Sequence, residues 1–143
     1  MFTKSIYSIL LLFCLFSNSL LGQTPSKKEN EINTLIDNAI DYWYNDQYDL
    51  SLRKAKKALD QSIAIKNNNL IAESYNVIGV NFDDLVQLDK AMFYYKQGLK
   101  YAQKTNNSVI KSKLNNNIAN IYFFEQKKIP VRIKLLSEII TVF

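Results

Sequence analysis

The sequence predicts an all-α protein built from consecutive pairs of antiparallel helices, and three observations point to that fold class. Between Ser26 and Ile129 there is no proline and there are only two glycines, Gly79 and Gly98, so strong turn signals are rare. Apolar residues recur every three or four positions, as they do on one face of a helix. The same residue types also return at an interval of forty residues.

Composition narrows the class of function. The 143 residues suffice for one domain, and 48% apolar with 22% charged residues is a globular composition. The net charge of +5 is too small to indicate a nucleic-acid partner. The chain has no His, the commonest general base and metal ligand, and its single Cys excludes an internal disulfide and a thiolate zinc site. We therefore expect no enzyme activity: no catalytic residues, no cofactor and no metal.

The first residues have the layout of a secretory signal peptide. A short start carrying Lys4 precedes an apolar run from Ile6 to Phe16, and small or polar residues follow up to Gly22. The run is shorter than the roughly 20 residues that span a bilayer. We expect a signal peptide at 1–22, a polar linker at 23–30, and export to the periplasm or medium of a bacterium. The alternative is an uncleaved segment that anchors the chain to a membrane.

Polar loops divide the remainder into helices. Stretches rich in Asn, Asp and Gln lie at 45–47, 66–69, 87–89 and 105–108. The helix before the first loop carries Leu35, Ala39 and Tyr42 on one face, and the helix after it carries apolar residues opposite the basic run 53–57. We interpret that run as a solvated helix face. The helices group into three copies of one unit, at 31–66, 70–106 and 109–143.

The copies align in columns when forty is added to each position. The first column consists of small residues, Ala39, Gly79 and Ala119. The second is aromatic, with Tyr42, Phe82 and Tyr122. The third is a second small column, Ser51 and Ala91, continued by Val131. A small residue lets the first helix of a pair approach the second closely. The aromatic residue one turn later fills the space beside it. These columns are therefore expected to pack inside each pair.

These residues resemble the tetratricopeptide repeat, whose units are antiparallel helix pairs. The resemblance covers residues 31–140 and implies tandem pairs stacked as a short right-handed superhelix of about three repeats. The interval of forty exceeds the family's usual length of about 34 residues. The third copy departs most, because its second helix, expected over 129–143 with Pro130 in its first turn, has Val131 and Glu138 where the other copies have small residues. Proline is tolerated in the first turn of a helix.

The resemblance also implies a scaffold that binds a peptide or another protein on its concave side. That side is formed by the first helix of each pair. The helical register assigns ten candidate residues to this surface: Asn33, Ile36, Trp43, Glu73, Asn76, Asp83, Lys113, Asn116, Asn120 and Phe123. Ile40, Tyr44, Val80, Asp84 and Phe124 fall on the same faces. Asn amides can pair with a peptide backbone, and aromatic side chains can anchor apolar groups.

Two sharper interpretations are not favoured. Family members that grip the carboxylate tail of a chaperone use a Lys and an Asn at the positions that Ile36 and Ile40 occupy here, so that clamp is absent. Asp83 and Asp84 are adjacent on a helix and point about 100° apart, so they do not converge on one metal ion.

The apolar residues at the end of the chain, "LLSEIITVF", predict a partner surface or self-association. An exported leader followed by such repeats also resembles the sensor regions of Bacteroidetes histidine kinases and transcriptional regulators. Two hypotheses follow: an exported, non-catalytic protein that binds a protein or peptide, or a truncated sensory module of a membrane signalling protein without its output domain.

Overall fold

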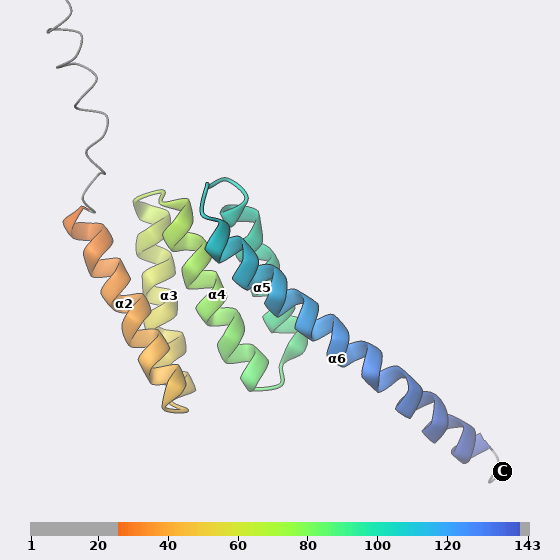
Figure 1. Ribbon diagram of the computed structural model, residues 1–143. Coiled ribbons are helices and arrows are strands. Elements are labelled where there is room, and N and C mark those ends of the chain that lie inside the picture. The colour runs from red at the N-terminus through yellow and green to blue at the C-terminus, as the bar shows by residue number, and fades with distance from the viewer. Residues whose placement is uncertain (1–25, 141–143) are drawn as a thin grey trace, which may run out of the picture.

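The computed structural model describes the backbone of residues 26–140 and the side chains of residues 26–129. Within that range it contains five helices and no strand: α2 (Lys27–Tyr44), α3 (Tyr48–Ala64), α4 (Asn68–Asp84), α5 (Leu88–Ala102) and α6 (Ser108–Ile140). The predicted all-α class is confirmed (Figure 1). The predicted signal peptide at 1–22 lies outside the described residues.

Three of the four connections are the same tight turn. The central residues Asp46, Lys66 and Val86 are twenty positions apart and have φ angles of 57°, 56° and 56°. In the first turn the Asp46 amide donates to the Trp43 carbonyl at 3.0 Å and the Gln47 amide donates to the Tyr42 carbonyl at 2.9 Å. This is the Schellman arrangement. The residue after each of these three is already the N-cap position of the next helix, so the chain reverses within three residues.

Asparagine caps recur forty residues apart at the starts of α4 and α6. The Asn67 side chain accepts hydrogen bonds from the Asn69 and Leu70 amides, and Asn107 accepts from Val109 and Ile110. These bonds satisfy amides that a helix start leaves free. The Asn67 amide group also donates at 2.7 Å to Glu29, which closes the capping box of α2 with Ser26. The starts of α2 and α4 are thereby tied together.

The helices form two layers. The first helices, α2, α4 and α6, contact one another in succession, and each of α3 and α5 packs against the helices before and after it in the chain. Figure 1 shows α2, α4 and the start of α6 in front of α3 and α5. Because α3 and α5 do not contact each other, the second layer is more widely spaced than the first. We call the more closely spaced layer of α2, α4 and α6 the inner layer.

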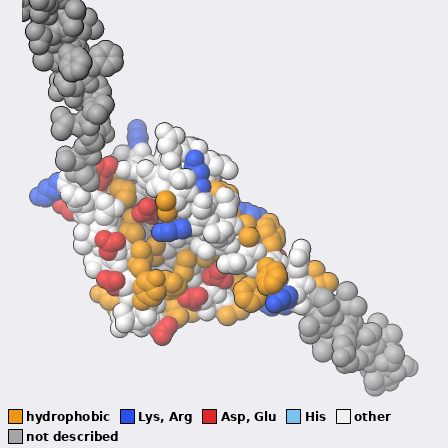
Figure 2. Space-filling view, in the orientation of Figure 1, with side chains coloured by type: hydrophobic (Ala, Val, Ile, Leu, Met, Phe, Trp, Pro, Cys, Tyr) orange, Lys and Arg blue, Asp and Glu red, His pale blue; other side chains and the backbone are white. Residues whose placement is uncertain are grey.

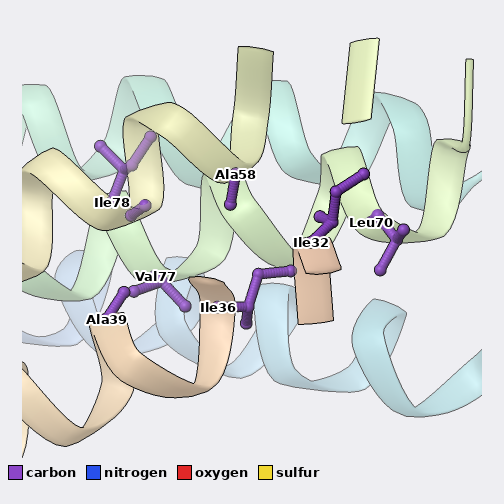
Figure 3. Packing of buried hydrophobic residues seen from close by; sticks show 8 residues of the cluster. Ile32, Ile36, Ala39, Ala58, Leu70, Val77 and Ile78 are labelled. Atoms are coloured by element: carbon purple, nitrogen blue, oxygen red, sulfur yellow. The ribbon is translucent and has the colours of Figure 1, made fainter. Parts of the chain in front are cut away.

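The first core cluster joins α2, α3 and α4 (Figure 3). Ile32 and Ile36 of α2 and Ile78 of α4 are nearly inaccessible to solvent, and burying each such side chain contributes about 1.5–3 kcal/mol. At its centre the Ser51 hydroxyl donates to the Ala39 carbonyl at 2.7 Å, which requires the backbones of α2 and α3 to lie close together. Both small residues are fully buried, as their columns predicted.

The second core cluster joins α4, α5 and α6 around Tyr95, which is 1% exposed. Gly79 lies directly beneath its ring, and a Cβ at position 79 would meet two ring carbons at 2.5 Å. The corresponding partners in the first pair are Ala39 and Ala55, both fully buried. The space between the two helices is therefore filled differently in the two pairs. Two alanine side chains fill it in the first pair, and an aromatic ring above a glycine fills it in the second.

A buried polar contact joins the first pair to the second. Asn81 of α4 is fully buried and donates to the Ser51 hydroxyl and to the Val77 carbonyl, both at 2.8 Å, while its own side-chain oxygen has no partner. A buried oxygen without a hydrogen bond costs about 1–3 kcal/mol, so this polar contact stabilises the fold less than a contact without an unpaired atom would. Forty residues later the same two positions are Ala91 and Ile121, both buried and apolar. The polar version favours one register, because sliding α4 along α3 would break the bond from Asn81 to Ser51, whereas the bond to Val77 lies within α4.

Among the described residues the third pair is not formed, and the expectation of a separate second helix from residue 129 onwards is wrong. The chain instead continues as one helix from Ser108 to Ile140, which extends beyond the other helices (Figure 1). As a consequence Ala119 and Tyr122 are exposed, although Gly79 is buried at the corresponding position of α4. A proline inside a helix costs about 3 kcal/mol through its missing donor and its clash with the preceding turn.

The sequence of the third copy explains the difference. The second helices α3 and α5 place Ser51 and Ala91 at the close approach to their partners, and both are fully buried. The corresponding residue 131 is a bulkier Val, and the charged Glu138 takes the place of Ala58 and Gly98. A folded-back third helix would have to bring these side chains into the closest part of the interface. Less burial is then available to stabilise the turn.

The pairing of a small residue at position 79 with a large one at position 95 can be tested with a double-mutant cycle. Gly79→Ala should destabilise the fold by about 1–3 kcal/mol through overpacking, despite the better helix propensity of Ala. Tyr95→Ala should cost about 3–5 kcal/mol through the cavity it leaves. In the double variant, which copies the Ala39 and Ala55 pair, the Gly79→Ala substitution should no longer be destabilising. Urea unfolding of the four proteins measures this, and additive effects would contradict the proposed contact.

The turn at Val86 should be improvable. A β-branched residue at φ 56° is strained, and Val86 is 71% exposed, so replacing it loses little burial. Val86→Asn should raise the free energy of unfolding by about 1 kcal/mol, because Asn adopts the left-handed conformation readily. Val86→Thr keeps the branched shape and should leave stability unchanged. Equal melting temperatures for the Asn and Thr variants would argue against strain at this turn.

Candidate ligand-binding groove

A hollow of about 330 Å³ lies on the inner layer, where the three first helices meet. Each helix contributes residues to its lining. They are Ile40, Trp43 and Tyr44 from α2, Asn76, Val77 and Val80 from α4, and Lys113, Asn116 and Asn117 from α6. We call this hollow, defined by these nine residues, the inner groove. Figure 2 shows apolar and acidic side chains lying together over the nearby ends of α2 and α4.

The α2 side of the inner groove is an aromatic wall. The rings of Trp43 and Tyr44 lie 4.5 Å apart with their planes tilted by 47°. The Trp43 ring nitrogen donates a hydrogen bond to a carboxylate oxygen of Asp84 at the end of α4. This bond fixes the orientation of the indole and ties the ends of α2 and α4 together. Tyr44 is 71% exposed, so its ring is available to a bound molecule.

The opposite side carries amide groups. The Asn117 amide nitrogen of α6 donates to the Asn76 side-chain oxygen of α4 at 3.0 Å. This bond leaves the Asn76 amide nitrogen and the Asn117 oxygen without other hydrogen bonds among the described residues. Asn116 is exposed beside them. Because an amide offers both donors and acceptors, this side of the groove matches the polar groups of a peptide backbone.

Charges around the groove are unevenly distributed. From Glu29 onwards α2 has no Lys or Arg, and neither has α4, whereas α6 contributes Lys113 to the groove. Burial raises the pKa of the Glu73 carboxyl, the charge of Lys113 partly opposes that rise, and Asp37 adds to it. Burial also raises the pKa of Asp83, which accepts a hydrogen bond from the Tyr95 hydroxyl at 3.2 Å. The surroundings of the groove on α2 and α4 are therefore acidic, although no carboxylate lines it, and its α6 edge carries Lys113.

The structure brings together four of the ten residues expected on the concave surface: Trp43, Asn76, Lys113 and Asn116. Asn33, Glu73 and Asp83 are half-buried on the first helices but do not line the inner groove, and Asn120 and Phe123 are exposed farther along α6. Ile36 is corrected, because it is 4% exposed and belongs to the first core cluster. A buried side chain is not accessible to a partner.

Sequence reasoning missed Val77 and Asn117, which also line the groove. Val77 is 6% exposed, so only an edge of it reaches the surface. Asn117 ends a run of three asparagines in α6 that is visible in the sequence. The register of one helix does not show which of the three faces α4, because that depends on the angle at which the two helices cross.

Metal and membrane features are absent from the part of the chain that the structure describes. No group of three His, Cys, Asp or Glu residues is placed to hold a metal ion there. Asp83 and Asp84 bond to different partners, Tyr95 and Trp43, in agreement with their expected divergence. Among residues 26–140, no helix is both long enough and apolar enough to cross a membrane.

Comparisons with models of protein families, with curated proteins and with solved structures found no match to this chain.

The pKa of Glu73 predicts a pH-dependent stability. Because the pKa of the folded chain lies above the ordinary value of 4.5, folded molecules bind more protons than unfolded ones in the interval above that value. The free energy of unfolding should therefore fall as the pH rises through this interval. Glu73→Gln should leave stability unchanged below the interval. Above it, the variant should be more stable by less than about 1 kcal/mol, since solvent screens a half-buried carboxylate.

Thermal melts between pH 3 and pH 8 measure this difference. Glu31→Gln, at an exposed position of α2, is the matched control for removal of one negative charge. A stability gain that is the same at every pH, or that is equal in the control, would rule out burial of the Glu73 carboxylate as the cause.

Proposed function

We propose that the protein is a non-catalytic scaffold of the tetratricopeptide-repeat kind, which binds a peptide segment of another protein in the inner groove. The observation that carries this proposal is the composition of the groove, where an aromatic wall faces three asparagine amides and one lysine. Two complete helix pairs with matching columns and matching turns support the repeat architecture.

The partner segment is expected to be extended. Asn76, Asn116 and Asn117 offer donors and acceptors to backbone amides and carbonyls, which every peptide has. A large apolar side chain fits against Trp43 and Tyr44, because aromatic residues at concave positions are common anchors of binding energy. The bound segment directs its apolar side chain towards α2, and its backbone runs over α4 and α6.

Charge adds selectivity. Glu73 and Asp84 lie next to the lining residues Lys113 and Trp43 and favour a basic residue of the partner on the α2 and α4 side, whereas Lys113 favours a carboxylate at the α6 edge. Charges of this kind mainly set specificity and the rate of association. The preferred ligand is therefore a short segment in which an apolar residue is flanked by one basic and one acidic residue.

The proposed setting is outside the cytoplasm. The layout of residues 1–22 supports export, and the partner is then another exported protein or the extracytoplasmic part of a membrane protein.

Trp43 provides a direct test, because it is the only tryptophan in the chain and lines the inner groove. Peptides selected on the full chain from a random display library should change the emission of Trp43 on titration. Asn116→Ala and Lys113→Ala should each weaken binding about tenfold, which corresponds to about 1.4 kcal/mol.

Two matched controls change the same residue types at exposed positions outside the groove. Asn69→Ala on α4 and Lys100→Ala on α5 should leave the dissociation constant unchanged. Selected peptides that bind all four variants equally, or that leave the Trp43 emission unaltered, would place binding elsewhere and refute the role of the inner groove.

A further inference from the structure

The second half of α6 exposes large apolar side chains on more than one side, and no other helix covers the side that carries Tyr122 and Ile129. Tyr122, Phe123, Phe124 and Ile129 are 49%, 56%, 58% and 53% exposed. On the side of α5, the Lys96 ammonium lies 5.9 Å from the centre of the Tyr122 ring, and Ile129 lines a hollow with residues 86–90. Three consecutive exposed aromatic residues in one helix are unusual for a surface in contact with water only.

The equivalent faces of α2 and α4 show what kind of element fits there. In α2, the Ala39 carbonyl accepts a hydrogen bond from Ser51 of α3. In α4, Gly79 lies under Tyr95, and Phe82 stacks on Tyr94 with the ring centres 5.3 Å apart. Each of these faces is covered by the second helix of its own pair. The face of α6 lacks a second helix.

The sequence that would supply this helix is present in the chain. Helices α3 and α5 begin at residues 48 and 88, so the matching segment begins at residue 128. Ser51, Ala55 and Leu59 of α3 correspond to Val131, Leu135 and Ile139, which recur at intervals of four and so form one apolar stripe. Residues 128–140 therefore have the pattern of a second helix.

The same molecule cannot place this segment on its own α6. Residues 125–127 are helical, whereas the tight turns stand at the corresponding positions 45–47 and 85–87. A straight helix rises about 1.5 Å per residue, so residue 131 lies about 18 Å from Ala119 along the axis. A second copy has no such restriction, because its α6 can lie antiparallel to the first.

We propose that two copies of the chain associate by exchanging their last helical segments. Residues 128–140 of each copy cover the face that Ala119, Tyr122 and their neighbours leave open on the other. The arrangement is isologous, since the same two surfaces meet twice around a two-fold axis near residue 125.

The occupant is a second copy rather than an unrelated protein because the chain itself carries an apolar stripe at the required offset, interrupted only by Glu138 at the position of Ala58 and Gly98. The exchange also gives a role to the helical continuity through Pro130, which a monomer would leave uncompensated. This inference does not depend on the inner groove, which lies at the other end of α6.

A disulfide experiment separates exchange from folding back within one molecule. In a Cys14→Ser background, one variant carries Ala119→Cys and another carries Val131→Cys. These positions match Ala39 and Ser51, which are in direct contact. Oxidation of the mixture should join the two variants into a covalent dimer. A single chain carrying both substitutions that oxidises only within itself, with no crosslink in the mixture, would overturn the proposal.

The hinge provides a second test. Gln126 occupies the position of Asp46 and Val86, the residues with left-handed backbone in the other turns. Gln126→Gly should permit a turn there and weaken self-association at least tenfold, whereas Gln126→Ala keeps the helix and should not. Sedimentation equilibrium of the full chain, from about 1 to 100 μM, measures both against the unaltered protein. An unaltered chain that is monomeric throughout, or two variants with equal dimerisation, would refute exchange.

Discussion

The close approach of the two helices in each pair is the constraint on which the rest of this structure depends. The distance between packed helices is set by the side chains at their contact, and small residues permit the shortest distances. Here the hydroxyl of Ser51 reaches the backbone carbonyl of Ala39, and the ring of Tyr95 lies directly on Gly79. With the helices this close, a connection of three residues suffices, and the same turn recurs every twenty residues. The inner layer then aligns α2, α4 and α6 side by side, which creates the inner groove.

Much of this arrangement was predictable from the sequence, because it follows from local rules. Helical periodicity, polar loops and the interval of forty predicted α2 to α5 and the burial of Ala39, Ser51 and Ala91. The continuation of α6 was not predictable in this way. Whether a chain turns depends on how much surface the following helix can bury, and Val86 shows that a turn can form at an unfavourable residue when α5 packs well behind it.

The candidate site illustrates the same limit on a smaller scale. Trp43, Asn76, Lys113 and Asn116 lie together in the inner groove because helical register decides which side of each helix they occupy. Ile36 lies only four positions from Ile40 on the same helix, yet it is buried in the core while Ile40 lines the groove. The groove therefore begins close to the end of α2, where Ile40, Trp43 and Tyr44 lie, whereas the middle of that helix packs into the core. Crossing angles depend on side-chain volumes across several helices and are not encoded in any one segment.

Helix α6 connects the two surfaces that matter for function. Its first turns supply Lys113, Asn116 and Asn117 to the inner groove, and its later turns carry the uncovered aromatic face. Both surfaces belong to one continuous helix, so a change in the direction of α6 at its far end also moves Lys113 relative to Asn76. A second copy that favours one direction of α6 therefore changes the affinity of the groove for the peptide. By the same free energy, the bound peptide changes the affinity for the second copy. The hydrogen bond from Asn117 to Asn76 is where this coupling would act, since it is the side-chain bond that holds α6 to α4 beside the groove.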